Sequence, residues 1–398
     1  MKILHLCLNG PYTDNWGYQE NILPKYHRLA GYDVVVVATN KMHVPSGEIV
    51  DTDAGSYFTP EGVKIIRLAP QKLRSKKFTK LFQPYQVYPV LKSEMPDLIM
   101  VHGLMGSVSI LDVHKYVHNV NRGCSVVADL HEGYFNSSGK CTSLKSALIG
   151  AYYKIVNRVM YPLYKKVFCI TPNCIDYAKG YYHVPSKLLE LLPLGYDPAL
   201  FDTEKAPSVR AEIREKYNIV NDDILIVHGG KIIPRRKTAE LIDAVSRLDD
   251  PRVKLIIFGG MSDELKVPVE SRISKHKAWL RYAGHLEQTE YYKLYQASDI
   301  AAFPGGQSVL WQEAISLGLP LLISRQPGVD YLDLGGNLEI VSSNTVESIY
   351  QGLQNMLRDD RYKEMANIAK ENGKAFFSYE RIARQVIESA SKQGKNNT

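Results

Sequence analysis

Short runs of apolar, mostly β-branched residues alternate along the chain with segments whose apolar residues recur at helical spacing. The pattern predicts a first series of strands at residues 3–8, 34–38, 63–68, 98–101, 125–130 and 167–171. A second series is predicted at residues 224–228, 254–258, 300–303, 320–323 and 338–341. Strands that are apolar on both faces and separated by helices are typical of parallel sheets covered on both sides. The sequence therefore predicts an α/β protein with two doubly wound, Rossmann-like sheets.

The segment 192–198 separates the two series and contains two prolines and a glycine, which is typical of a link between domains. We assign residues 1–195 to an N-terminal domain and residues 196–376 to a C-terminal one. If the domains face each other, the carboxyl ends of their strands, where such folds bind ligands, border a cleft. A nicotinamide-binding domain is disfavoured, because residues 9–17 lack Gly-x-Gly-x-x-Gly and the second strand ends without an acid.

Composition narrows the class of protein. The 398 residues are 45% hydrophobic, and no apolar run approaches the roughly 20 residues of a membrane-spanning helix. The five cysteines show no metal-binding spacing, which indicates buried free thiols in a reducing cytoplasm. The net charge of +7 lies in the first half: residues 1–200 hold 22 Lys and Arg against 15 Asp and Glu, and the remainder holds 27 of each. This asymmetry indicates either an anionic partner or a solvated basic surface.

The strongest local pattern is a loop rich in glycine and cations, between a predicted strand and the helix predicted at 239–248. It contains Gly230, Lys231, Arg235, Arg236 and Lys237. Glycine lets a ligand approach the backbone, and the free N–H groups and dipole of a helix N-terminus favour an anion. We expect a diphosphate at this loop. The alternative is an ordinary basic loop that Thr238 caps.

A second Gly-Gly turn follows the strand predicted at 300–303 and leads into another helix. Ser308 is placed to cap that helix, and the backbone N–H groups of Gly306, Gln307, Ser308 and Val309 would then point at the cleft as a second anion site. Glu313 lies near the helix N-terminus. Its carboxylate would accept hydrogen bonds from a ribose diol, or would only complement the helix dipole.

These motifs resemble those of the retaining GT-B glycosyltransferases of family 4, which use nucleotide sugars in glycoconjugate synthesis. The phosphate loop of that family reads Gly-Arg-Leu-x-x-x-Lys-Gly, and this chain has Gly230, Lys231 and, at the same spacing, Lys237. The resemblance implies that both lysines neutralise the donor diphosphate, with Lys231 in the place of an arginine. Of the family's two glutamates, Glu313 matches the second, which holds the donor ribose, whereas Gly305 stands where the first is expected.

Weaker resemblances extend over nearly the whole chain. Gly17 lies in the loop that would contact the donor phosphates and the acceptor, and His131 matches a histidine that reaches the donor sugar. Without the resemblance, a single histidine at a strand end is more often structural. The segment with His285 and Leu286 resembles the one whose backbone reads the nucleobase. Residues 377–392 resemble a last helix that crosses back onto the N-terminal domain.

The resemblance implies a GT-B fold and a hexosyltransferase-type enzyme of polysaccharide or glycoconjugate synthesis. It would move a sugar from a UDP- or GDP-sugar to a glycan or lipid-linked acceptor, with retention, through the catalytic residues His131, Lys231 and Lys237. The sequence offers no metal-ligand cluster and no covalent nucleophile. We therefore expect electrostatic stabilisation of the departing diphosphate, without metal or cofactor, and no nucleic acid partner. Two alternatives stay open: an inactive nucleotide-sugar-binding protein, motivated by Gly305, and a nucleotide-sugar epimerase of the same fold.

Two segments of the N-terminal half mix cations with aromatic and apolar residues, namely residues 72–82 and a helix predicted at 144–165. On that helix an apolar stripe comprises Leu144, Leu148, Tyr152, Ile155, Val159 and Leu163, and a second stripe comprises Lys154, Arg158, Tyr161 and Lys165. Cations near an anionic leaflet contribute about 1 kcal/mol each. We expect a cytoplasmic protein that docks peripherally on the inner face of the membrane. The alternative is that the apolar stripe packs on the domain core.

Overall fold

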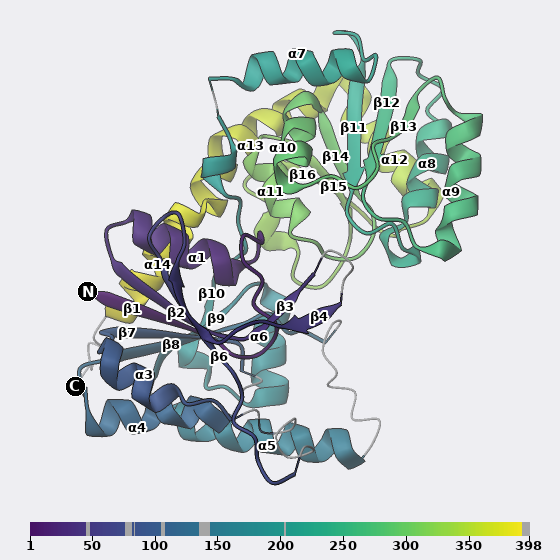
Figure 1. Ribbon diagram of the computed structural model, residues 1–398. Helices are drawn as coiled ribbons and strands as arrows, with labels where there is room; N and C mark the ends of the chain where they lie inside the picture. The colour runs from purple at the N-terminus through teal and green to yellow at the C-terminus, as the bar shows by residue number, and fades with distance from the viewer. Residues whose placement is uncertain are drawn as a thin grey trace, which may run out of the picture. The chain divides into compact units, whose positions relative to one another are not determined.

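The computed structural model describes residues 1–44, 48–75, 82, 84–104, 108–134, 144–202 and 204–391, without the side chains of Leu144 and Lys145. Its internal contacts divide the chain into two units (Figure 1). Unit 1 comprises Met1–Pro193 and Ile382–Thr398, and unit 2 comprises Leu194–Arg381. The chain therefore passes from one unit to the other after Pro193 and returns inside its last helix.

Unit 1 is built on a sheet of eight strands in the order β10-β9-β8-β7-β1-β2-β6-β5. These are β1 (Lys2–Cys7), β2 (Asp33–Thr39), β5 (Gly55–Phe58), β6 (Lys64–Leu68), β7 (Leu98–His102), β8 (Ser125–Leu130), β9 (Tyr164–Cys169) and β10 (Leu189–Leu191). All neighbours run parallel except β5 and β6. The main helices are α1 (Gln19–Leu29), α3 (Val87–Glu94), α4 (Leu111–Asn119), α5 (Leu144–Met160), α6 (Pro172–Tyr177) and the end of α14 (Tyr379–Ser391).

Unit 2 is built on a fully parallel sheet of six strands in the order β13-β12-β11-β14-β15-β16. The strands are β11 (Ile224–Gly229), β12 (Val253–Phe258), β13 (Leu280–Tyr282), β14 (Ile300–Phe303), β15 (Leu321–Ser324) and β16 (Leu338–Val341). The helices are α7 (Ala206–Lys216), α8 (Thr238–Ser246), α9 (Asp263–Lys275), α10 (Gln288–Ala297), α11 (Leu310–Ser316), α12 (Val346–Leu357) and α13 (Arg361–Phe377).

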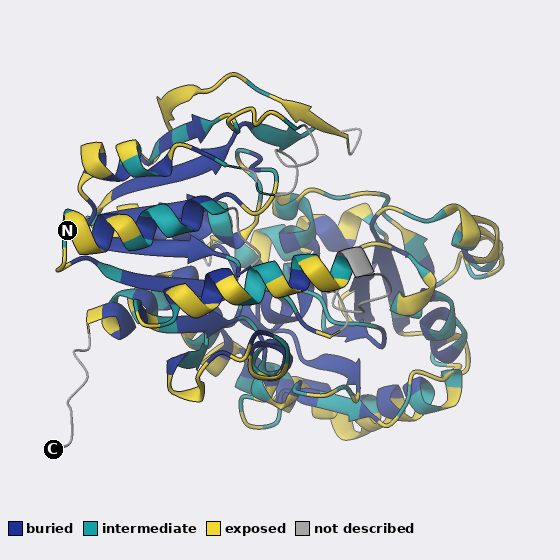
Figure 2. Cartoon of the chain, turned by 90° about the horizontal axis from the view of Figure 1, so that it is seen from below, coloured by how far each residue is buried: buried dark blue, intermediate teal, exposed yellow. Residues whose placement is uncertain are grey.

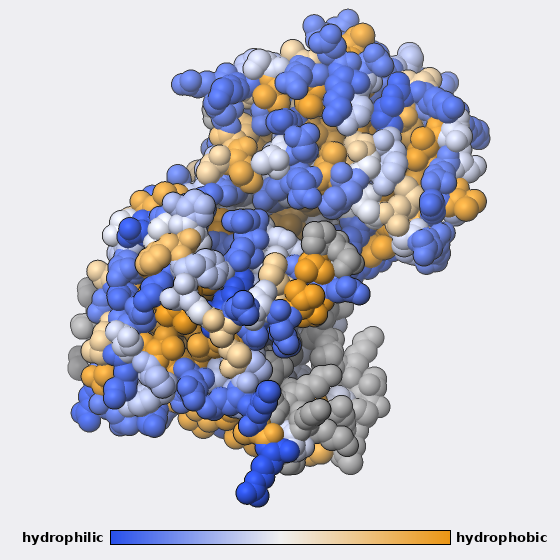
Figure 3. Space-filling model, viewed as in Figure 1, coloured by the Kyte–Doolittle hydropathy of each residue, from blue (hydrophilic) through white to orange (hydrophobic). Residues whose placement is uncertain are grey.

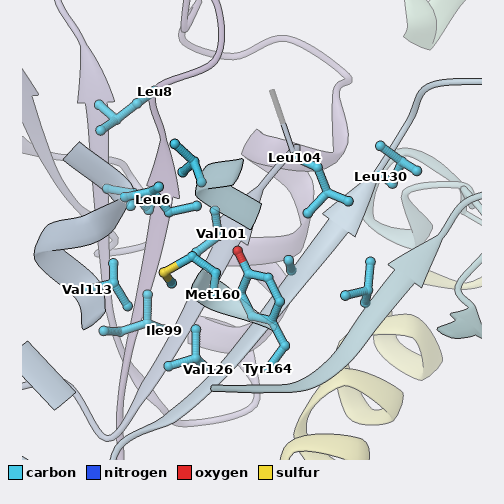
Figure 4. Close-up of a cluster of buried hydrophobic side chains, with 14 of the residues drawn as sticks. Leu6, Leu8, Ile99, Val101, Leu104, Val113, Val126, Leu130, Met160 and Tyr164 are labelled. Atoms are coloured by element: carbon cyan, nitrogen blue, oxygen red, sulfur yellow. The ribbon is translucent and has the colours of Figure 1, made fainter. Parts of the chain in front are cut away.

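The strands bury both of their faces, as the apolar runs predicted. Along β2, Val35 and Val37 join the core on one face of the unit 1 sheet, and the alternating Val34 and Val36 join the core on the other. Figure 4 shows the first of these cores, where Val113 and Met160 contribute from helices beside residues of the central strands. The buried strands and the exposed outer sides of the helices are visible in Figure 2. The doubly wound α/β prediction is therefore confirmed.

Several boundaries differ from the prediction. The helix predicted at 144–165 ends at Met160, and the strand predicted at 167–171 begins at Tyr164. Pro162 in the connection lacks the N–H group that a further helical turn would use. The last helix, predicted at 377–392, is α14 and is separated from α13 by extended backbone at Ser378. The sequence pattern missed β5, β10 and β13, and also the antiparallel pair β3 (Lys41–His43) and β4 (Ile49–Asp51). These strands are short, and most are exposed or half-buried.

Candidate functional site

The loop between β11 and α8 forms the first part of the candidate site, at the carboxyl end of the unit 2 sheet. Gly230 adopts φ +96°, a conformation that glycine takes without strain, and a Cβ there would meet Leu310 at 3.1 Å. The Ile232 N–H donates to Gly260 O at 2.8 Å, and the Ser262 N–H donates to Ile232 O at 3.0 Å. The glycine-rich turn is thus fixed between the loop after β12 and the start of α11.

The predicted cations of this loop have different environments. Lys231 and Arg235 are exposed, and Lys237, which precedes α8 in the left-handed region at φ +61°, places its Nζ 2.8 Å from Glu240 Oε1. Arg236 is turned into the protein, where its Nη1 donates to the carbonyl oxygens of Gly306 and Gln307. Burial, with a further contribution from Arg235, lowers the pKa of Arg236. Arg236 therefore holds two loops together rather than adding another exposed charge.

His228 fixes both ends of the same loop. Its Nδ1 lies 2.7 Å from Ala302 O, so this nitrogen donates, and its Nε2 lies 2.9 Å from Thr238 Oγ1 and accepts from the hydroxyl. Burial lowers the pKa of His228 to about 4, with a smaller effect of Arg236, and the ring is neutral. Thr238 is the first residue of α8 rather than its cap, so the capping role given to it in the alternative interpretation is wrong.

The loop after β14 is tied to the first loop by Gly305 and Gly306. The Gly306 N–H donates to Arg235 O at 3.1 Å, so the prediction that this amide faces a ligand is wrong. A Cβ on Gly305 would overlap the backbone of Arg235 and Arg236. A glutamate at position 305 would therefore displace the basic loop, which is a physical reason for the departure from the family motif.

The helix that follows, α11, begins one residue later than it would if Ser308 were its cap. Val309 precedes the first helical residue, Leu310, and no side chain caps the helix. Ser308 Oγ instead accepts a weak hydrogen bond from the Leu310 N–H at 3.4 Å. Gln307, Ser308 and Val309 are half-buried. The structure thus places these three residues beside the basic loop without assigning them a ligand.

Glu313 lies in the first turn of α11 and is 2% exposed. Three donors of α10 hold its carboxyl group: Gln288 Nε2 at 3.0 Å, the Tyr292 hydroxyl at 3.2 Å, and the Tyr291 hydroxyl at 3.1 Å. Burial raises the pKa of Glu313 to about 8, although these hydrogen bonds act in the opposite direction. Glu313 is therefore predominantly protonated near neutral pH. The three donors were not predicted from the sequence, although their spacing of three and four residues on one helix face was an available signal.

The loop after β13 contains His285 and Leu286. The Gly284 carbonyl accepts from the Gly259 N–H at 2.7 Å, and this contact joins the loops after β12 and β13. His285 is exposed, whereas Leu286 packs against the unit 2 core. Since all strands of this sheet are parallel, the loops that follow β11, β12, β13 and β14 meet at one edge.

The part of the site predicted in unit 1 is centred on His131, directly after β8. His131 Nε2 lies 3.4 Å from Asp129 Oδ2, and a second histidine, His102, places its Nδ1 at 2.6 Å from the same oxygen. The Gly103 N–H donates to Asp129 Oδ1 at 2.8 Å. Burial opposes ionisation of Asp129, but the two histidines outweigh it and hold the pKa of Asp129 well below its usual value. Burial likewise lowers the pKa of His131, but Asp129, with Glu20 and Glu132, raises it to about 9.

Gly17 is an exposed residue of the loop between β1 and α1. The adjacent Trp16 stacks on the ring of His43, with ring centres 5.2 Å apart. The buried Arg67 of β6 fixes this loop, because its Nη1 donates to Tyr12 O at 2.9 Å and its Nη2 pairs with Asp14 at 2.9 Å. The loop is thus held in place while Gly17 itself stays accessible.

Other features of the described part of the chain bear on function. Among the residues that the structure describes, no three His, Cys, Asp or Glu side chains are grouped as a metal site. None of the helices in these ranges is both long and apolar enough to cross a membrane. Cys7, Cys124, Cys169 and Cys174 are buried free thiols, as expected, and Cys141 lies outside the described residues.

Comparison with known proteins supports this description of the fold. Residues 209–376 match the sequence model of the family "Glycosyl transferases group 1". No curated protein matches the sequence. Among solved structures, HepE from Anabaena in complex with UDP superposes with a TM-score of 0.70 at 16% identity, over 98% of this chain and 100% of that one.

Two further structures show how widely the architecture is shared. WaaG, a glycosyltransferase involved in lipopolysaccharide biosynthesis, superposes with a TM-score of 0.65 at 15% identity, over 99% of this chain and 100% of that one. The UDP-GlcNAc 2-epimerase from Neisseria meningitidis bound to UDP-GlcNAc has a TM-score of 0.60 at 16% identity, over 98% of this chain and 99% of that one. The chain therefore has the GT-B fold, and its unit 2 carries a domain of the glycosyl transferases group 1 type.

Proposed function

We propose that the protein is a retaining glycosyltransferase, similar to those of family 4, that transfers a sugar from a UDP- or GDP-sugar to a glycan or lipid-linked acceptor. The observation that carries this proposal is the loop between β11 and α8, where Lys231, Arg235 and Lys237 lie at the carboxyl end of a parallel sheet. Such a concentration of positive charge beside a glycine turn suits a diphosphate. The match of residues 209–376 to glycosyl transferases group 1 supports the same chemistry.

In the proposed reaction the bond between the anomeric carbon of the sugar and the diphosphate breaks. The acceptor oxygen bonds to the same carbon from the same face, and the acceptor proton passes to the departing diphosphate. Lys231 and Lys237 would stabilise the negative charge that develops on the leaving group, so no metal is required. His131, which is charged near neutral pH, would contact the donor sugar.

The remaining predicted residues would form the subsites for the donor. Glu313 and the three donors of α10 would bind the ribose, because a protonated carboxyl group can both donate to and accept from a diol. His285 and Leu286 would border the nucleobase. The other donor contacts would come from Gly17, Gly230, Gln307, Ser308 and Val309.

The proposal is tested by incubation with a panel of UDP- and GDP-sugars and candidate acceptors, with and without EDTA. Transfer with release of the nucleoside diphosphate, in the presence of EDTA, supports the proposal. Interconversion of the donor sugar without an acceptor would instead identify an epimerase. Tight binding without either reaction would identify a nucleotide-sugar-binding protein.

We further propose that unit 1 docks on the inner, anionic face of a membrane, where a cytoplasmic enzyme would meet a lipid-linked acceptor. The 17 residues of α5 include no Asp or Glu. Leu148, Ile155 and Val159 of this helix are 64%, 66% and 43% exposed, so the alternative, in which this stripe packs on the core, does not hold for them. Val156 and Met160 supply the buried face instead. Figure 3 shows hydrophobic side chains along the lower edge of unit 1, where α5 runs in Figure 1.

The second predicted docking segment is adjacent to this helix. Phe82 packs edge-on against Tyr152 of α5, with ring centres 5.4 Å apart. Lys72, Leu73 and Arg74 are exposed, and residues 76–81 lie outside the described part of the chain. Exposed apolar residues flanked by cations, without nearby acids on the helix, are typical of reversible membrane binding.

A further inference from the structure

Glu240 places a carboxylate beside the loop between β11 and α8, where a diphosphate is proposed to bind. It is the third residue of α8, after Thr238 and Ala239. Its Oε1 lies 2.8 Å from Lys237 Nζ, and the side chains of Lys237 and Glu240 are 29% and 32% exposed. A carboxylate in the first turn of a helix also complements the helix dipole. Glu240 thus already uses the two attractions, a lysine and a helix N-terminus, that favour a diphosphate here.

The backbone of Lys237 is fixed on both sides. Lys237 directly precedes α8 and adopts φ +61° and ψ +32°. Its N–H donates to Pro234 O at 3.2 Å, and its carbonyl oxygen accepts from the Leu241 N–H at 3.0 Å. The hydroxyl of Thr238, the next residue, is committed to His228. The position of the Lys237 Cα is therefore set by the loop, and a change of partner requires only that its side chain turns.

The other cations of this loop have no such partner. Lys231 and Arg235 are exposed, and neither forms an ion pair with a residue that the structure describes. Arg236 donates to two carbonyl oxygens of the neighbouring loop instead of to a carboxylate. Within the described loop, Lys237 is thus the cation whose charge an acid already compensates.

The nearest alternative cation does not draw Glu240 away from Lys237. Arg272 of α9 donates from Nε to Asp243 Oδ1 at 2.8 Å and from Nη2 to Asp243 Oδ2 at 2.7 Å. These hydrogen bonds raise the pKa of Arg272, and the charge of Glu240 adds to this effect. Because Asp243 binds the guanidinium through both of its oxygens, the carboxylate of Glu240 remains with Lys237.

We propose that Glu240 competes with the bound diphosphate for Lys237 and thereby limits the affinity of the site. This inference rests on the proposed function, since it takes the loop between β11 and α8 as the diphosphate site. On binding, the Lys237 ammonium turns from Glu240 to a phosphate oxygen, and no covalent bond or proton is exchanged. When the nucleoside diphosphate leaves, the ion pair forms again. The loss of a partly exposed pair of this kind weakens binding by about twofold to fivefold.

Competition for Lys237 differs from simple repulsion in its dependence on the lysine. Repulsion between Glu240 and the diphosphate acts whether or not Lys237 is present, whereas an ion pair can be lost only if Lys237 is there. Glu240→Gln therefore removes both effects in the wild-type background, but repulsion alone in the Lys237→Ala background. The difference between the two gains in affinity isolates the competition.

The test is calorimetric titration of UDP and of GDP into the wild type, Glu240→Gln, Lys237→Ala and the double variant at low ionic strength. Glu240→Gln should bind the diphosphate at least about threefold more tightly than the wild type. In the Lys237→Ala background the gain should be smaller by about twofold or more. Alanine keeps a Cβ at position 237, so the left-handed backbone is equally unfavourable in both backgrounds.

The matched control is Glu264→Gln, at an exposed position in the first turn of α9. It removes the same charge from a residue that does not pair with Lys237, so any gain in affinity should be equal in the two backgrounds. If Glu240 only stabilised α8, Glu240→Gln would lower stability in urea, but its gains in affinity would not differ between backgrounds.

Equal gains in the two backgrounds, or no gain in the wild type, would overturn the competition. The proposed diphosphate site would survive that result if Lys237→Ala still weakened binding. If neither nucleotide binds, or if Lys237→Ala leaves both affinities unchanged, the proposed function fails and this inference fails with it.

Discussion

Arg236 lies where a side chain on Gly305 would begin, since a Cβ at residue 305 would overlap the backbone of Arg235 and Arg236. The guanidinium of Arg236 also donates to the carbonyl oxygens of Gly306 and Gln307. The basic loop and the Gly-Gly turn are thus packed directly on each other, and the absence of a side chain at residue 305 makes this contact possible.

The first prediction follows from this contact. Gly305→Glu should not restore a sugar-binding glutamate, but should destabilise the protein by roughly 1–3 kcal/mol and weaken nucleotide binding, because the basic loop must move. Gly306→Ala is the matched control, since a Cβ there has no neighbour within 4 Å and φ is not positive. The measurements are urea unfolding and nucleotide titration. A Gly305→Glu variant as stable as Gly306→Ala, with unchanged nucleotide affinity, would contradict the packing argument.

The second prediction concerns Glu313. Its folded-state pKa of about 8 exceeds the usual value of 4.5, so the unfolded chain releases the proton first as the pH rises. Glu313 therefore lowers the free energy of unfolding progressively as the pH rises from about 4.5 to about 8, and the full loss of stability is reached above about pH 8. Glu313→Gln has no carboxyl group to ionise and therefore lacks this penalty. The free energy of unfolding of the variant should exceed that of the wild type increasingly as the pH rises, by more than about 1 kcal/mol at pH 8.

The control for this measurement is Glu287→Gln, at an exposed position beside α10. Urea unfolding of the three proteins between about pH 5 and pH 8 provides the comparison. If the stability difference between Glu313→Gln and the wild type is the same at all pH values, the buried neutral carboxyl group is excluded.

The third prediction tests the docking surface. The double variant Leu148→Glu, Ile155→Glu should lose at least about tenfold in binding to anionic phospholipid vesicles, because it places two charges on the proposed membrane face. The control adds the same charges to unit 2 through Val220→Glu and Val267→Glu, which are 64% and 74% exposed. Co-sedimentation at low and high salt is the readout. Wild-type protein that stays in solution with anionic vesicles at low salt would refute the docking proposal.

The sequence predicted the fold well because the core strands are continuous apolar runs. Most predicted strands lie within one residue of their observed bounds. The exposed β5 and the pair β3–β4 were missed because short strands without a buried face have no such pattern. The loop with Lys231 and Lys237 was also located from sequence, since glycine and charge mark it.

The sequence pattern could not predict contacts between segments that are distant along the chain. The pairing of His102 with Asp129 depends on the register of β7 and β8, and the contact of His5 with His27 depends on how α1 packs. A signal was nevertheless present, because each of His5, His102 and Asp129 is a polar residue in a mostly apolar strand. The inward turn of Arg236 had no comparable signal, since it follows from the approach of Gly305.

Calorimetric titration with a nucleoside diphosphate and the corresponding nucleoside tests the central claim most directly, that the loop between β11 and α8 holds the donor diphosphate. Lys231→Ala and Lys237→Ala should each weaken diphosphate binding about tenfold or more, since a charge-assisted contact contributes roughly 1.5–3 kcal/mol. Nucleoside binding should remain unchanged, and Lys275→Ala, at an exposed position on α9, should affect neither ligand. Equal losses for diphosphate and nucleoside, or no loss for either, would contradict the assignment of this loop.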